Sequence, residues 1–163
     1  MIKPSGILFD LDGVIFQGDR LIPGAEDIIR KLQAIKIPYR FITNTTRMTK
    51  NNVVNMLCKM GFSVTPEEIF TAPHAAVEYC KLKGYKHISL IIPDEEMKEN
   101  FSTFQFMDEN PEAIIVGDMG KLFTFELLNS LFLNIINGAE LIAMHKNRYW
   151  KSLNGLTLDL GAF

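Results

Sequence analysis

The sequence predicts an α/β protein made of two successive units. In the first half, short apolar strand patterns alternate with helical patterns in the order strand, helix, strand, helix, strand. Connections of this kind are right-handed and place the strands side by side in a parallel sheet. The same organisation begins again near Pro73. We therefore expect one unit over residues 1–72 and a second over residues 73–163.

The elements of the first half follow from apolar spacing and from helix start and stop residues. The first strand is the apolar run 7–9, which ends at Asp10. Pro23 and Gly24 open a helix with apolar residues at helical spacing. Further along the chain, we expect a strand over 38–43, a helix that ends at Gly61 and a short strand over 68–71.

The second half contains the elements of another small α/β unit. A helix is expected over 75–83, and the helix over 124–137 has Glu126 in its first turn and Gly138 behind it. The other expected elements are strands over 87–92, 113–117 and 140–144, a loop over 93–110 and a hairpin around Asn154-Gly155.

Composition excludes several classes of protein. The chain has 163 residues, of which 47% are hydrophobic and 22% charged, so it can form a globular core. A net charge of −2 gives no electrostatic basis for binding nucleic acid or a membrane surface. No signal peptide pattern is present, and the apolar patch 131–136 is too short to cross a bilayer. Cys58 and Cys80 lie in helical patterns, which favours reduced thiols and a cytoplasmic location.

The first chemical feature is the segment Asp10-Leu11-Asp12-Gly13 at the end of the first strand. Residues at i and i+2 of an extended chain lie on the same face, so the two carboxylates are close together. At ~4 Å and an effective dielectric of about 20, their repulsion is on the order of 4 kcal/mol. A hard cation such as Mg²⁺ relieves it, using carboxylates, water and phosphate oxygens. A polar turn open to water is the alternative.

The second feature is Thr43-Asn44 at the end of the next predicted strand. In open α/β sheets, ligands bind beyond the carboxyl ends of the strands. Hydroxyl and amide groups there can hold phosphate oxygens. The alternative is a helix cap, but the presence of both features favours a phosphate site.

These residues resemble a known family. GILFDLDGVIF resembles motif I of the haloacid dehalogenase superfamily of phosphohydrolases, and FITNTTR resembles its motif II. The spacing is similar to that of the branch with a large α/β cap inserted after motif II. The resemblance implies that residues 1–72 are the N-terminal half of a Rossmann-like core and that residues 73–163 are the cap. The implied function is an Mg²⁺-dependent phosphatase for small phosphorylated metabolites.

The resemblance also implies residue roles. Asp10 is the expected nucleophile that forms an aspartyl phosphate, and Asp12 the expected general acid and base. The Asp10 carboxylate and the Asp12 backbone carbonyl are the expected Mg²⁺ ligands. Gly13, Thr43 and Asn44 are expected to surround the phosphoryl group.

Two later motifs of the family, a lysine and a set of acidic metal ligands, cannot be assigned in this sequence. Asp118 follows an apolar strand but is interpreted as a loop residue of the cap. We therefore expect little turnover by this chain alone. A non-catalytic module for metal, phosphate or protein association stays open. A phospho-accepting receiver domain is weaker, because Phe70-Thr71-Ala72 stands at the end of the third strand, where its aspartate belongs.

Three further expectations concern surfaces. The edge of the first strand, or the cap, is expected to mediate a homo-oligomer. The segment 145–149 either faces an anionic substrate or forms a solvated turn, and Trp150 is interpreted as a packing residue.

Overall fold

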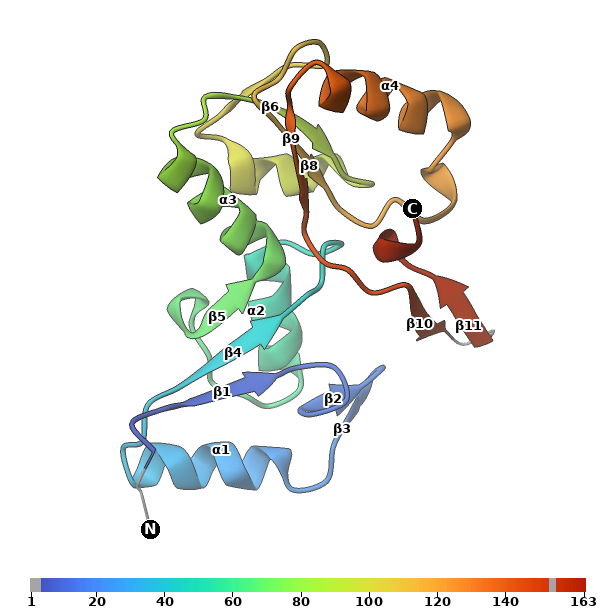
Figure 1. Cartoon of the computed structure of the whole chain (residues 1–163). Helices are drawn as coiled ribbons and strands as arrows, with labels where there is room; N and C mark the ends of the chain where they lie inside the picture. The colour runs from blue at the N-terminus through green and yellow to red at the C-terminus, as the bar shows by residue number, and fades with distance from the viewer. Residues whose placement is uncertain (1–3, 153–154) are drawn as a thin grey trace. The chain divides into compact units, whose positions relative to one another are not determined.

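The computed structural model describes residues 4–152 and 155–163 and divides them into two compact units (Figure 1). The first unit consists of the chain up to Thr43 and of Lys50–Thr71. The second consists of Asn44–Thr49 and Ala72–Phe163. The chain therefore enters the second unit briefly, directly after Thr43, before it does so again at Ala72.

The first unit contains a parallel sheet with the strand order β1 (Ile7–Asp10), β4 (Tyr39–Thr43) and β5 (Ile69–Thr71). Helix α1 (Ala25–Ala34) connects the first two strands, and α2 (Lys50–Lys59) with a 3₁₀ turn (Pro66–Glu68) precedes the third. This order confirms the predicted parallel arrangement. A small hairpin, β2 (Phe16–Gln17) and β3 (Arg20–Leu21), follows β1 and was not predicted.

One face of this sheet is covered and the other is open within the unit. Phe41 and Ile69 occupy paired positions on the covered face and are buried. On the other face, Leu8 is 67% exposed and Phe70 is 43% exposed. Because side chains alternate along a strand, the apolar contacts of α1 and α2 are confined to one side of the sheet.

The second unit has a four-stranded parallel sheet in the order β7-β6-β8-β9. The strands are β6 (His87–Ile91), β7 (Gln105–Phe106), β8 (Ala113–Val116) and β9 (Glu140–Ala143). All four residues of β8 are buried, as expected for a central parallel strand covered on both faces. Ala113 and Ile115 pack with α3 (Ala72–Lys83), while Ile114 and Val116 pack with α4 (Phe125–Ile136).

The predicted loop 93–110 is wrong in part. It contains a 3₁₀ helix (Glu95–Phe101) and the short strand β7. Met97 and Phe101 are buried, so this segment contributes to the core of the second unit. Its mostly polar composition gave no sign of this contribution.

The chain ends in the predicted hairpin, β10 (Tyr149–Ser152) and β11 (Gly155–Leu158), and a 3₁₀ turn (Leu160–Ala162). Asn154 of the predicted turn lies outside the described residues. Within the described ranges, no helix has both the length and the apolar character needed to cross a membrane.

Candidate functional site

Asp10 and Thr43 lie at the carboxyl ends of two neighbouring parallel strands. In the ladder between β1 and β4, Asp10 is the partner of Ile42, so Thr43 is the next residue along the adjacent strand. Neighbouring strands are about 4.8 Å apart. The register therefore brings the predicted nucleophile and the predicted phosphate ligand to the same edge of one sheet.

The Asp10 side chain is held by the chain that follows it. The backbone N–H of Leu11 donates a hydrogen bond of 2.8 Å to a carboxylate oxygen of Asp10. Leu11 is 1% exposed and so anchors this amide in the core, whereas Asp10 is exposed. The carboxylate is therefore oriented by the protein and open to solvent or a ligand.

Asp12 and Gly13 occupy a tight turn around Leu11. The Leu11 carbonyl accepts hydrogen bonds from the backbone amides of Val14, Ile15 and Phe16, at 2.8 to 3.3 Å. Gly13 has φ +78°, in the left-handed region that favours glycine, and a Cβ there would contact nothing within 4 Å. Glycine is thus favoured at this position by backbone conformation, and Asp12 is exposed on this turn.

Asn44 differs from the other predicted site residues. It is exposed, and it is the first residue of the segment Asn44–Thr49 that belongs to the second unit. It is joined to Thr43 by one peptide bond. The structure therefore brings Asp10 and Thr43 together, with Asp12 and Gly13 on the turn after Asp10, and places Asn44 where the chain leaves the first unit.

The protein ligands available to a metal are few. No group of three or more His, Cys, Asp or Glu side chains is gathered in the described part of the chain. A zinc site of several His and Cys ligands is thereby excluded for those residues. Two exposed carboxylates with nearby backbone oxygens fit Mg²⁺, which keeps most of its ligands as water or phosphate oxygen.

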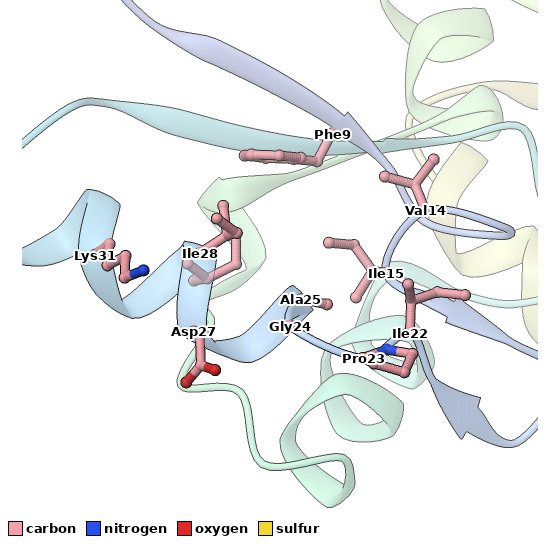
Figure 2. Close-up of a pocket in the computed structure, with 11 residues that line it drawn as sticks. Phe9, Val14, Ile15, Ile22, Pro23, Gly24, Ala25, Asp27, Ile28 and Lys31 are labelled. Carbon is pink, nitrogen blue, oxygen red and sulfur yellow. The ribbon is translucent and has the colours of Figure 1, made fainter.

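An apolar groove of about 380 Å³ runs between β1 and α1 in the first unit (Figure 2). Phe9, Ile15 and Ile28 line it, and the Asp27 carboxylate points away from it. Convergent hydrogen-bond donors are what a phosphate needs, and among the side chains that line this groove only Lys31 carries a charged donor. The groove is therefore distinct from the phosphate site expected at the strand ends.

The structure separates His145 from the rest of the segment 145–149. The His145 side chain is 8% exposed and lies 3.5 Å from the Asp159 carboxylate, so His145 itself is not part of a solvated turn. Residues 146–149 are exposed, so both interpretations of that part of the segment stay predictions. Trp150 is 42% exposed, and the Arg47 guanidinium lies 5.9 Å from its ring centre. Trp150 is thus partly exposed and contacts Arg47, and its expected role as a packing residue stays a prediction.

Asp118 lies in a loop after β8, in the second unit, as predicted. It is 5% exposed, and its carboxylate pairs with Arg47 at 2.5 Å. Sequence reasoning missed Arg47 as a site residue. Its only sequence signal was its position four residues after Thr43, in the segment FITNTTR.

Comparisons with known proteins agree with this geometry. Residues 7–106 match the family described as haloacid dehalogenase-like hydrolase. Haloacid dehalogenase-like hydrolase domain-containing protein 2 of Mus musculus is 35% identical over 159 residues, which is 98% of this chain and 60% of the relative. Phospholysine phosphohistidine inorganic pyrophosphate phosphatase of Homo sapiens is 27% identical, over 97% of this chain and 59% of the relative.

A solved structure has a similar fold. The crystal structure of 4-nitrophenylphosphatase from Thermotoga maritima matches 97% of this chain and 61% of its own length, with a TM-score of 0.87 and 25% identity. The chain thus spans about 60% of the length of these relatives.

Proposed function

Because the chain belongs to the haloacid dehalogenase-like hydrolase family, we propose that its first unit carries the phosphoryl-accepting part of an Mg²⁺-dependent phosphatase for small phosphorylated metabolites. The single observation that supports this most is the register of β1 and β4. It aligns the exposed Asp10 carboxylate with the strand end at Thr43. The phosphatase names of the relatives give the reaction class.

In the proposed reaction, an Asp10 carboxylate oxygen attacks the phosphorus atom of a phosphate monoester. A bond forms between that oxygen and phosphorus, and the bond between phosphorus and the leaving oxygen breaks. The Leu11 amide, which holds the carboxylate, keeps its direction fixed during this step.

Asp12 completes the proton balance. In its protonated form it donates a proton to the leaving oxygen, and as a carboxylate it then accepts a proton from the attacking water. That water displaces phosphate and regenerates Asp10. The exposure of Asp12 on the turn after β1 suits exchange of this proton with solvent.

The remaining site residues bind and orient the phosphoryl group. Thr43 and Asn44 donate hydrogen bonds to phosphoryl oxygens, and Gly13 gives the turn its left-handed backbone. The Asp10 carboxylate and the backbone carbonyl of Asp12 would hold Mg²⁺, which would supply positive charge to the phosphoryl group. No lysine or acidic cluster of the later family motifs can be assigned in this sequence, so we expect slow hydrolysis of p-nitrophenyl phosphate.

NMR titration of the ¹⁵N-labelled chain with Mg²⁺ tests the proposal. We expect weak binding, in the millimolar range, that shifts the amides of residues 10–13 and is lost in Asp10→Asn. Asp19→Asn is the matched control, because it removes an exposed carboxylate between β2 and β3. Equal responses from Asp10→Asn and the wild type would rule out the metal site.

A second titration addresses phosphate. With Mg²⁺ present, inorganic phosphate is expected to shift the amides of Thr43 and Asn44 in the wild type and in Asp19→Asn. A chain that binds Mg²⁺ but shows no phosphate response at these amides would contradict the phosphatase assignment.

A further inference from the structure

The segment Asn44–Thr49 leaves the predicted phosphate strand and packs within the second unit before the chain returns at Lys50. Thr46 is 2% exposed and Thr49 is 5% exposed. A six-residue excursion with two buried threonines is held in place by specific contacts, because its polar groups need partners when they leave water.

Asp118 provides the contacts that hold this segment. Its backbone N–H donates to Oγ1 of Thr46 at 3.0 Å, and its carboxylate accepts from Nη2 of Arg47 at 2.5 Å. The other carboxylate oxygen accepts from the amide of Gly120 at 2.9 Å. Two consecutive residues of the segment are thus bound to one residue of the loop after β8.

The glycines beside Asp118 allow this close approach. A Cβ on Gly117 would lie 3.3 Å from Cβ of Thr46 and 2.9 Å from Cε of Met144. Gly120 has φ +51°, and a Cβ there would lie 3.2 Å from Nη2 of Arg47. The loop around Asp118 is therefore shaped to accept the segment.

The burial of Asp118 makes the pair asymmetric. Its side chain is 6% exposed, whereas that of Arg47 is 49% exposed. Loss of the Arg47 charge leaves a buried carboxylate without its cation, which is far more costly than the loss of an exposed ion pair. The Asp118 carboxylate is thereby engaged by Arg47 and by the Gly120 amide.

We propose that the Arg47–Asp118 pair is a positioning device for the phosphate site. It fixes the path of the chain immediately after Thr43, and thereby the backbone of Asn44, which is joined to Thr43 by one peptide bond. The expected effect on phosphate binding rests on the proposed function, in which Asn44 is a phosphate ligand. The geometric part of the proposal is that the conformation of residues 44–49 depends on the Arg47–Asp118 pair, and this part does not depend on the proposed function.

The test uses the full ¹⁵N-labelled chain with Arg47→Gln, Arg47→Lys and Asp118→Asn. Arg30→Gln is the matched control, because Arg30 pairs with Glu26 at 2.6 Å on the surface of α1. Hydrogen exchange of the Asp118 and Gly120 amides reports on the pair itself. Affinities for Mg²⁺ alone, and for inorganic phosphate with Mg²⁺ present, report on the site.

We expect Arg47→Gln and Asp118→Asn to speed exchange at both amides and to weaken phosphate binding by about tenfold. Mg²⁺ binding is expected to stay unchanged, because its proposed ligands, Asp10 and the Asp12 carbonyl, lie at the end of β1 and on the turn after it, outside residues 44–49. Arg47→Lys is expected to restore much of the phosphate affinity, and Arg30→Gln to match the wild type. A general loss of stability would not separate phosphate from Mg²⁺ in this way.

Wild-type phosphate affinity in Arg47→Gln, or unchanged exchange at both amides, overturns the proposal. If the wild type binds no phosphate, the proposed function fails. The NMR resonances of residues 44–49 then test whether their conformation depends on the pair. Resonances that shift in Arg47→Gln support this dependence, and unshifted resonances overturn it. If Asp118→Asn does not fold, the two Arg47 variants give the same decision.

Discussion

Alkaline pH should destabilise the chain through one buried thiol. Cys80 lies on α3 with 0% exposure and packs with Val77, Ile88 and Phe101. Burial, and after it the negative charge of Glu140, raises the pKa of the Cys80 thiol from its ordinary value of 9.0 to about 11. The folded protein therefore keeps this proton over a range of pH in which the unfolded chain has lost it.

The sign and size of the effect follow from this difference in pKa. Well below pH 9.0 both states hold the proton, and the thiol makes no pH-dependent contribution to stability. As the pH rises toward 11, the free energy of unfolding falls, because only the unfolded chain ionises. One pKa unit corresponds to about 1.4 kcal/mol, so we expect a loss of roughly 2 kcal/mol by about pH 10.5.

Urea unfolding of the wild type and Cys80→Ala at about pH 8 and about pH 10.5 measures this contribution. Tyr85 and Lys83 also have raised pKa values, caused first by hydrogen bonds to Glu140 and to Tyr79 respectively, so the wild-type slope alone is not diagnostic. The difference in free energy between the two proteins isolates Cys80. A difference that does not change with pH would refute the reasoning, and Cys58→Ala, which alters an exposed thiol, is the control.

Three further outcomes are expected. Phe101→Ala should lower the free energy of unfolding by about 3–5 kcal/mol, whereas Phe125→Ala, at a side chain 78% exposed, should change it by less than about 1 kcal/mol in the same urea titration. Gly161→Ala should lower the melting temperature, because its Cβ would overlap the carbonyl of Lys146; an unchanged value would contradict this. We propose that the chain self-associates through the β1 edge and the open face of the first sheet. Light scattering should then show oligomers, and Leu8→Lys should reduce their amount. A strictly monomeric wild type would exclude this proposal.

The sequence predicted the elements whose apolar residues repeat with a clear period. The strand over 113–117 is a continuous apolar run, and the helix over 124–137 has a Thr cap, an acidic first turn and a Gly after its end. The hairpin β2–β3 was missed because its strands have two residues each, too few to show alternation. The 3₁₀ helix Glu95–Phe101 was missed because only Met97 and Phe101 of its seven residues are buried.

The candidate site was predictable only where its groups are local. Asp10 and Asp12 are two residues apart, and Thr43 ends the next strand of the sheet, so strand order alone predicts their common edge. The pairing of Arg47 with Asp118 joins residues about seventy positions apart. No periodic pattern encodes such a contact, because it depends on how two separate loops meet.

The brief excursion at Asn44–Thr49 bears on how this protein can be divided. A fragment that begins at Ala72 would contain Asp118 but not Arg47 or Thr46. Such a fragment would expose a buried carboxylate and the surface that these residues cover. Exchange of the second unit between relatives should therefore transfer residues 44–49 along with 72–163, so that the exchangeable module is discontinuous in sequence.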